Sequence, residues 1–386
     1  MQHLVALQLA ALLIAVPLAT KKFLVVPGGV LAVVILIGVW VPFHGRRLAL
    51  WPGIVADFRK RQRPAPPEPD EASGSADLAP IRTCVPGLAL EAAYDRTHGT
   101  VGMVGDGTFL TSVLLVEAPD EPLRPRRAGH PLPLAAVASA LSVDGIVVGS
   151  AQVVLHSRPA PAPHLPAEAM AARAYQELSQ RDNLNVPAVR QTWVAVRLDP
   201  SRCTTAIAAR GGGYEGAQRT LLRAVNQLTA ALAANGLTAR PLDEQGLVQA
   251  LIASCGINRA AQPGRARTAA RIAESRHAWR CDDRWHATYW VSRWPKLTAA
   301  GSPDVIASLT GAPGIATTFA LTAHMGGGGS LAVQGHVRVS ARSSDELEAA
   351  ARHLEARGRH AGLSLVRLDF EQQPGLLATI PLGGGA

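Results

Sequence analysis

The sequence predicts an α+β protein with an N-terminal two-helix transmembrane hairpin, followed by a cytoplasmic region of two tandem βαββαβ units. Three observations lead to this prediction. Two uncharged apolar runs, residues 4–19 and 23–43, stand close together at the start of the chain. Basic residues are concentrated directly after the second run. Beyond a proline-rich stretch, the same order of strand and helix patterns occurs twice.

The two apolar runs predict a membrane anchor over residues 1–45. A helix needs roughly 20 apolar residues to cross a bilayer, which the second run supplies and the first approaches. The alternatives are cleavage of the first run as a signal peptide, which leaves one anchor, and a buried helical pair. Against cleavage, no Lys or Arg precedes the first run, and Lys21 and Lys22 stand where the cleavage site would be. Three small residues of the second run, Gly28, Gly29 and Gly38, would allow close helix packing in the bilayer.

The distribution of basic residues predicts the orientation. Two lysines lie between the runs, whereas six basic residues follow the second run, namely Arg46, Arg47, Arg59, Lys60, Arg61 and Arg63. By the positive-inside rule, the N-terminus and the C-terminal region are then cytoplasmic, and the protein crosses the inner (plasma) membrane twice. The same six side chains are expected to contact anionic lipid headgroups.

Charge and cysteine content limit the possible classes of function. Residues 1–63 hold eight Lys or Arg and one Asp, so most of the net charge of +9 lies there. A nearly neutral remainder argues against nucleic acid as a partner, because that requires a basic face on the folded part. The four cysteines (Cys84, Cys203, Cys255 and Cys281) form no CxxC motif and are expected to be free thiols, although a disulfide stays open.

Composition divides the rest of the chain into four parts. Residues 46–82 are expected to form a basic juxtamembrane stub and a proline-rich linker, with the folded region beginning near Thr83. A first α/β unit covers residues 83–254 and a second covers residues 279–386. Residues 255–278 are basic, rich in Ala and Gly, and are expected to form a loop between them.

Each unit is predicted from hydrophobic periodicity. In the first, strands are expected at 108–117, 150–156, 191–198 and 237–242, with helices at 132–141 and 215–235. In the second, strands are expected at 285–294, 315–321, 331–339 and 363–368, with helices at 303–309 and 343–357, the latter opened by the capping box Ser343-x-x-Glu346. Both orders are those of a ferredoxin-like unit. The alternative is one mixed α/β domain in which the repeated order is a coincidence.

No motif predicts catalysis, a cofactor or a metal site. The glycines Gly99-x-x-Gly102-x-x-Gly105-x-Gly107 precede a strand instead of following one, so they indicate a glycine-rich strand and turn and not a phosphate loop. Glycines 211–213 stand before the long helix, where backbone N–H groups could hold an anion, but a loose turn is the simpler interpretation. Asp282 and Asp283 with His286 could hold a divalent ion or serve glycosyl transfer, but a turn opening a strand is favoured.

The most distinctive stretch is residues 279–295, which hold four of the seven tryptophans. Clustered tryptophans can form a core or an interaction hot spot, and both interpretations stay open. In the core interpretation, Trp290 and Trp294 lie on the same face of a strand. In the interface interpretation, the partner contacts are Trp279, Trp285, Trp290 and Trp294.

Five stretches together resemble the EccE family, the membrane subunit of actinobacterial type VII (ESX-type) secretion systems. They are the hairpin ending in Trp40 and His44-Gly45-Arg46-Arg47, THGTVGMVGDGTFLTSVLLVE at 97–117, RQTWVAVRLDP at 190–200, the tryptophan-rich stretch, and the tail PGLLATIPLG at 374–383.

The resemblance implies a structural subunit at the periphery of a complex with the membrane proteins EccB, EccC and EccD, of which EccC is the motor ATPase. It supplies no catalytic residues. A membrane-tethered envelope enzyme resembling a glycosyltransferase and a conjugation-type accessory protein are the alternatives.

Overall fold

The computed structural model describes residues 50–63, 76–118, 132–159, 187–258, 271–296 and 302–384, with isolated positions between 8 and 47 and between 169 and 177. The chain divides into two units, residues 1–66 and residues 67–386, and each is described by itself.

The described part of the first unit is small. Strands β1 (Pro42–Phe43) and β2 (Arg46–Arg47) pair, and helix α3 (Trp51–Arg61) follows. Basic residues in the last turn of α3 suit the negative end of the helix dipole. The predicted hairpin over residues 1–45 lies almost wholly outside the described residues. Within the described part, no helix combines the length and apolarity required to cross a membrane.

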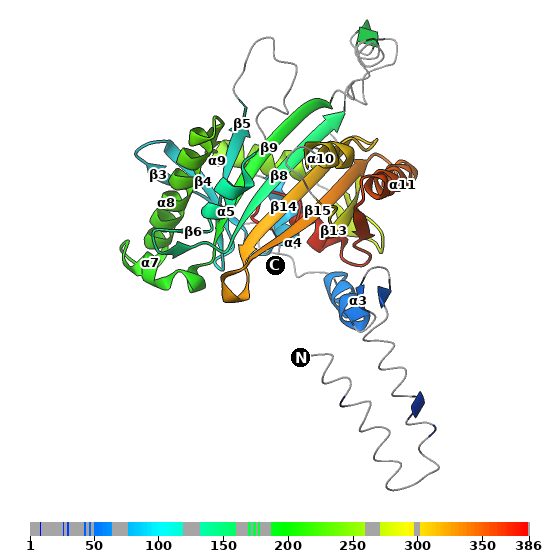
Figure 1. The fold of residues 1–386 in the computed structure, drawn as a ribbon, viewed down its shortest axis with the longest axis horizontal. Coiled ribbons are helices and arrows are strands. Elements are labelled where there is room, and N and C mark those ends of the chain that lie inside the picture. The colour runs from blue at the N-terminus through cyan, green and yellow to red at the C-terminus, as the bar shows by residue number, and fades with distance from the viewer. Residues whose placement is uncertain are drawn as a thin grey trace. The chain divides into compact units, whose positions relative to one another are not determined.

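The second unit contains two runs of elements (Figure 1). The first run consists of η3 (Ala76–Leu78), α4 (Ala79–Cys84), β3 (Ala89–Asp95), β4 (Gly99–Gly105), β5 (Leu110–Glu117), α5 (Leu134–Ser139), β6 (Ser142–Val143), β7 (Ile146–Val147), β8 (Ser150–Pro159), β9 (Pro187–Leu198), η5 (Pro200–Arg202), α7 (Thr204–Ala208), α8 (Gly213–Ala234), β10 (Thr238–Pro241) and α9 (Glu244–Cys255). The second consists of β11 (Ile272–Glu274), β12 (Trp279–Cys281), β13 (Arg284–Arg293), α10 (Ser302–Thr310), β14 (Ala316–Met325), η8 (Gly327–Gly329), β15 (Leu331–Ala341), α11 (Ser344–His360), β16 (Ser364–Arg367) and α12 (Gln372–Leu377).

One large antiparallel sheet joins both runs, which agrees with the predicted α+β class. In the first half the neighbouring strands are β10-β5-β9-β8, and in the second half they are β16-β13-β15-β14. If these four strands of each half are numbered in chain order, both halves have the strand order 4-1-3-2. The hairpin β3–β4 extends the first half beside β5, and the hairpin β11–β12 extends the second half beside β13.

The halves meet through their second strands, because β8 pairs with β14. Figure 1 shows these two strands side by side, with β9 next to β8 and β15 next to β14. Val154 of β8 faces Ala320 of β14 at the middle of this pairing. An equivalent backbone hydrogen bond occurs in both halves, directly after the fourth strand of each. Leu242 N–H donates to Val113 O at 2.8 Å, and Leu368 N–H donates to Thr288 O at 3.0 Å.

Helices cover both faces of the sheet. On one face, α5, α7 and α8 bury the first half while α10 and α11 bury the second, and Leu321 of β14 packs against both of these clusters. On the other face, α4, α9, α12 and the C-terminal segment cover the strands of both halves. Successive residues of one strand serve the two faces, as Val153 and Val154 do on β8.

Each half contributes a segment that lies over the other half. After α12, the C-terminal segment crosses to the first half, where Gln152 of β8 donates to Ala378 O and accepts from Gly383 N–H, both at 2.9 Å. After α9, the chain crosses to the second half, where Gly256 packs against the ring of His286. The two halves are therefore interlocked and share the core cluster on this face of the sheet.

The structure corrects several boundaries expected from the sequence. The folded region begins before Thr83, because Leu78 and Ile81 are both 0 % exposed in the core. Two helices that were not expected, α9 and α12, follow the last strand of each half. The expected loop at 255–278 contains β11 and lies partly outside the described residues. The expected capping box forms, with Ser343 Oγ accepting from Glu346 N–H at 3.2 Å.

Candidate partner interface

Trp279 belongs to the core. It lies on β12, is 1 % exposed, and packs with its ring centroid 5.4 Å from that of His286. Its neighbours come from the cluster beneath α9 and α12. A side chain with this burial does not reach a partner surface.

The other three tryptophans of the predicted cluster are half-buried and lie in different places. Trp285 is stacked beneath the guanidinium of Arg280, 5.8 Å from the ring centroid. Trp294 meets Phe319 edge to face, with centroids 6.2 Å apart. Trp290 lies on β13 between the buried residues Tyr289 and Val291, so its side chain points to the opposite face of the sheet from theirs.

Trp290 and Trp294 do not share a face, contrary to the expectation. The pairing of β13 with β16 shifts register between Val291 and Arg293. This bulge inserts one residue and changes the face to which later side chains point. Trp294 therefore joins the α10–α11 side, where its indole covers Gly335. A bulge leaves no mark in a hydrophobic pattern, which explains the error.

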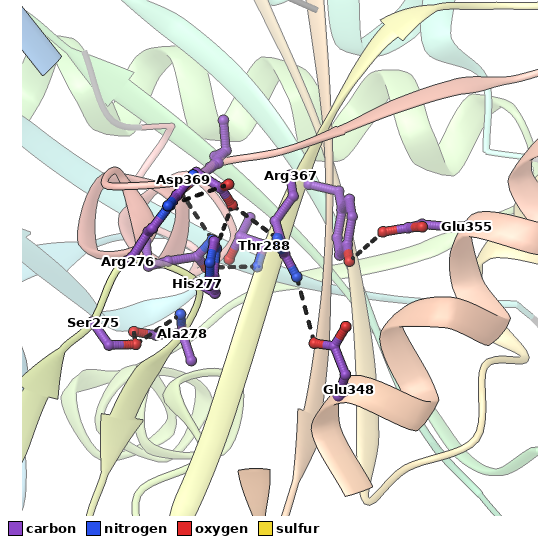
Figure 2. A network of polar contacts seen from close by, with 12 residues as sticks. Ser275, Arg276, His277, Ala278, Thr288, Glu348, Glu355, Arg367 and Asp369 are labelled. Atoms are coloured by element: carbon purple, nitrogen blue, oxygen red, sulfur yellow. Dashed lines mark hydrogen bonds and ion pairs between the residues drawn. The ribbon is translucent and has the colours of Figure 1, made fainter. Parts of the chain in front are cut away.

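A polar network lies beside these tryptophans, where the β11–β12 turn meets the segment between β16 and α12 (Figure 2). Asp369 is at its centre, with its side chain 10 % exposed. Its carboxylate accepts from Arg367 Nε at 2.8 Å and lies 3.0 Å from His277 Nδ1 and 3.9 Å from Arg276 Nε. The Arg276 guanidinium also stacks 5.0 Å from the ring centroid of Phe370.

The same network reaches α11. Arg367 Nη1 lies 3.5 Å from Glu348 Oε2, and Tyr289 Oη donates to Glu355 Oε1 at 2.9 Å (Figure 2). Burial, together with the neighbouring Glu355 carboxylate, raises the pKa of Tyr289 above its ordinary value. These contacts link the helix, the turn and the end of β16 to one another.

A second polar cluster is buried between α9 and the sheet. Arg338 of β15 is 0 % exposed, and its guanidinium donates to Ser254 O at the end of α9. His286 Nδ1 lies 2.9 Å from Ser340 Oγ in the same cluster. Burial lowers the pKa of Arg338 to about 10, and it lowers the pKa of His286 well below the ordinary value, with the charge of Arg338 as a further cause.

The cysteines lie in the core and form no disulfide within the described residues. Cys281 is hydrogen-bonded to Cys255, and this bond, together with burial, raises the pKa of Cys281. The contact joins the end of α9 to the end of β12, which belongs to the other half. Spacing in the sequence gave no sign of this contact.

Asp282 and Asp283, the acidic pair that an enzymatic function would use, lie in different environments. Asp282 adopts φ +51° in the β12–β13 turn, and its carboxylate, 2 % exposed, binds Arg271 at 2.8 and 2.9 Å. Asp283 is half exposed and binds Asn258 and Arg284. In the described part of the chain, no group of three or more His, Cys, Asp or Glu side chains is arranged to hold a metal ion.

The glycine motifs have structural explanations. Gly102 N–H donates to Leu242 O at 2.7 Å, and a Cβ at Gly102 would stand 2.6 Å from Asp243 O, so α9 can begin there only over a glycine. Glycines 211–213 all adopt positive φ where the turn after α7 leads into α8. Such a turn requires glycine for conformational reasons alone.

Only some of the residues predicted to contact the membrane lie among the described residues. Gly28 and Gly38 lie outside the described residues, and nothing stands within 4 Å of a Cβ built on Gly29. The side chains of Arg46 and Arg47 also lie outside the described residues. Arg59, Lys60 and Arg63 are exposed at the end of α3, and Arg61 is half-buried.

Sequence reasoning missed a group of exposed cations at the end of α11. Arg352 and Arg359 lie seven residues apart on the helix, as do His353 and His360, and all four are exposed. A spacing of seven corresponds to two turns, so each pair lies on one side of the helix. Alternation of exposed charges in a helix is the signal that could have revealed this group.

Comparison with known families gives one match. A family model described as "Putative type VII ESX secretion system translocon, EccE" matches residues 186–291. This range runs from the beginning of β9 through α8 and α9 to the tryptophans of β13. Comparison with curated proteins gives no match. Residues 186–291 are therefore similar to the EccE family of type VII (ESX) secretion-system translocon proteins.

Proposed function

We propose that this protein is a structural membrane subunit of a type VII secretion machine, which anchors and docks at the periphery of the EccB/EccC/EccD membrane complex. The observation that carries the proposal is the family match, which covers the segment joining the two halves of the sheet. Its description names a translocon and no reaction. We infer a role in binding instead of catalysis, with no cofactor and with protein and anionic lipid as partners.

In this proposal residues 1–45 form the two-pass anchor, with both the N-terminus and the C-terminal region in the cytoplasm. The support is the excess of six basic residues after the second apolar run over two between the runs. Small residues at 28, 29 and 38 would let the anchor pack against neighbouring helices. The remaining chain is proposed to act as two ferredoxin-like units, for which the equal strand orders of the two halves give support.

The docking surface is proposed to include a half-buried tryptophan of β13. Trp290 is the best candidate, because it belongs to none of the three core clusters of the described residues although it is large and only partly covered. Large aromatic side chains at the centre of an interface commonly supply much of its binding energy. The network around Asp369 would hold this surface in one conformation before a partner binds.

Affinity purification of the full chain from its native membranes tests the proposal. We expect EccB, EccC and EccD to co-purify with the wild type. Replacing Trp290 by Ala should reduce their recovery while the protein stays folded, whereas Trp294→Ala should lower stability because Trp294 packs on Phe319. Replacing the glycines at 28, 29 and 38 by Leu should weaken recovery without preventing membrane insertion.

The test has clear opposing outcomes. Purification of the wild type without any type VII component would contradict the structural role. Full secretion by a chain that lacks residues 1–63 would contradict the anchor. A strongly active alkaline phosphatase fused after the last residue would contradict the proposed topology, since that enzyme matures only outside the cytoplasm.

A further inference from the structure

The C-terminal half of α11, the end of β13 and the residues just after it carry an exposed group of cations. This group, here called the α11 cation patch, consists of Arg293, Lys296, Arg352, His353, Arg359 and His360. Helix and strand ends lie side by side there. Arg293 pairs with Ser364 of β16, which follows the helix directly, and a Cβ at Gly362 would stand 3.4 Å from Pro295 Cβ. The patch thus combines residues that are about 60 positions apart in the chain.

Several other arginines of the described surface are paired with acids. Arg219, Arg223 and Arg367, for example, each bind a carboxylate. By contrast, no ion pair within the described residues involves Arg293, Lys296, Arg352 or Arg359. The nearest acid of the helix, Glu355, binds the Tyr289 hydroxyl instead.

Part of this arrangement has a local explanation. Basic residues in the last turn of a helix are favoured by its dipole, which accounts for Arg357, Arg359 and His360. Arg352 and His353 lie earlier than the last turn, Arg293 ends β13 and Lys296 follows it, so the dipole does not account for these four. Repulsion among unpaired cations costs free energy, which an anionic partner would recover.

We propose that the α11 cation patch binds an acidic segment of a partner protein in the secretion complex. The inference rests on the proposed function and names the chemistry of one docking partner. Arginine recognises carboxylates through two parallel hydrogen bonds, and three of the four fixed charges of the patch are arginines. Arg352 and Arg359 stand about 10 Å apart along the helix axis, two turns of rise, which matches two acidic residues seven positions apart on a partner helix.

A protein carboxylate fits the patch better than a lipid headgroup does. Helices that bind a membrane surface also insert large apolar side chains into it. None of the exposed large hydrophobic residues of the described chain belongs to α11 or to the end of β13. The apolar stripe of α11 (Leu347, Ala350, Ala351 and Leu354) is buried against the sheet instead.

Ala356 is exposed and lies on the helix surface between the Arg352–Arg359 pair and the His353–His360 pair. A small side chain there would let a second helix approach closely, so that its carboxylates reach both Arg352 and Arg359. This position also supplies an independent variant, because Ala356→Trp would block a helix without changing any charge.

The test uses the tagged full chain in its native membranes. In one variant Arg352 and Arg359 are both replaced by Glu; the matched control replaces Arg96 and Arg202, two exposed arginines of the first half that form no ion pair within the described residues. We expect the first variant to lower recovery of type VII partners about tenfold, because like charges then oppose the partner. The control should behave as the wild type does, and Arg352→Lys/Arg359→Lys should keep most of the recovery.

A second arm measures direct binding. The full chain in neutral-lipid nanodiscs is titrated with a labelled synthetic helical peptide that carries Glu at positions seven apart, and flotation with phosphatidylglycerol vesicles is measured separately. We expect the peptide to bind the wild type and the control, to bind the charge-reversed variant and Ala356→Trp about tenfold more weakly, and to dissociate as salt rises.

A failure of this inference can be distinguished from a failure of the proposed function. Unchanged recovery and unchanged peptide binding in the charge-reversed variant would overturn the inference while the structural role stands. Loss of vesicle binding alone would assign the patch to lipid and also overturn it. Failure of the wild type to recover any type VII component would contradict the proposed function, and the peptide titration would still decide whether the patch binds carboxylates.

Discussion

His156 of β8 and Thr318 of β14 lie 2.9 Å apart across the pairing that joins the two halves of the sheet, although 162 positions separate them in the chain. His156 is 4 % exposed, and its ring stacks on Trp193 with centroids 6.0 Å apart. The joint between the halves therefore depends on an imidazole that must be neutral.

Acid is expected to destabilise the fold through this histidine and through His286. Burial lowers the pKa of His156 to about 3, with the charges of Arg338 and Arg158 as further causes, and it lowers the pKa of His286 well below 6.5. In the unfolded chain both titrate near 6.5, so stability is complete above that pH and is lost as the pH falls toward the folded values. The loss should be about 1.4 kcal/mol per pH unit for each histidine.

Urea unfolding of the full chain in detergent, followed by tryptophan fluorescence at pH 7.5 and pH 5.5, measures this effect. The double variant His156→Gln/His286→Gln should show a smaller difference between the two pH values. The exposed pair His353 and His360 provides the control, since replacing both by Gln should leave the difference unchanged. An equal pH dependence in all three proteins would contradict the assignment.

Removing the C-terminal segment should loosen the first half of the sheet instead of the second. The segment is held by Gln152, and Thr111 Oγ1 also donates to Leu382 O at 3.1 Å. Ending the chain after Ala378 leaves the Gln152 side-chain oxygen and the Thr111 hydroxyl without these partners, at a cost of about 1–3 kcal/mol for each group. Hydrogen exchange should rise in β5 and β8. A rise confined to α12 would show that the halves are not interlocked.

The two adjacent aspartates should respond very differently to substitution. Asp282→Ala removes a buried partner of Arg271 and should cost about 3–5 kcal/mol. Asp283→Ala changes a half-exposed side chain and should cost no more than about 0.5 kcal/mol. Thermal unfolding of both variants measures the difference. Two stable variants, together with loss of a measurable glycosyl transfer, would instead support the tethered-enzyme alternative.

Gly102→Ala should be strongly destabilising for a reason that its place in a glycine repeat does not reveal. The added Cβ would meet Asp243 O at 2.6 Å and Glu244 N at 2.8 Å, both of them backbone atoms that cannot rotate away. We expect a loss of about 1–3 kcal/mol, as for overpacking in general. Gly327→Ala, where nothing stands within 4 Å, is the control and should leave the unfolding temperature unchanged.

Many elements could be predicted from the sequence because their signals are local. The stripe Leu221, Leu222, Val225, Leu228 and Leu232 predicted α8, and all five side chains are buried. Ser343 and Glu346 predicted the start of α11 through the capping bond that they form. Alternation predicted β9 and β15. The helices α4, α9 and α12, of six to twelve residues, were not predicted.

By itself, the sequence determined the α+β class, the order of elements in each half and the resemblance to the EccE family, because periodicity, caps and short motifs are properties of neighbouring residues. Only the tertiary structure decided what the halves do together. It joined β8 to β14, brought Cys255 to Cys281, buried Arg338 beneath α9 and paired Arg293 with Ser364 just after α11. Such contacts join residues tens to hundreds of positions apart, and they form because each half leaves one sheet face uncovered that a segment of the other half can bury.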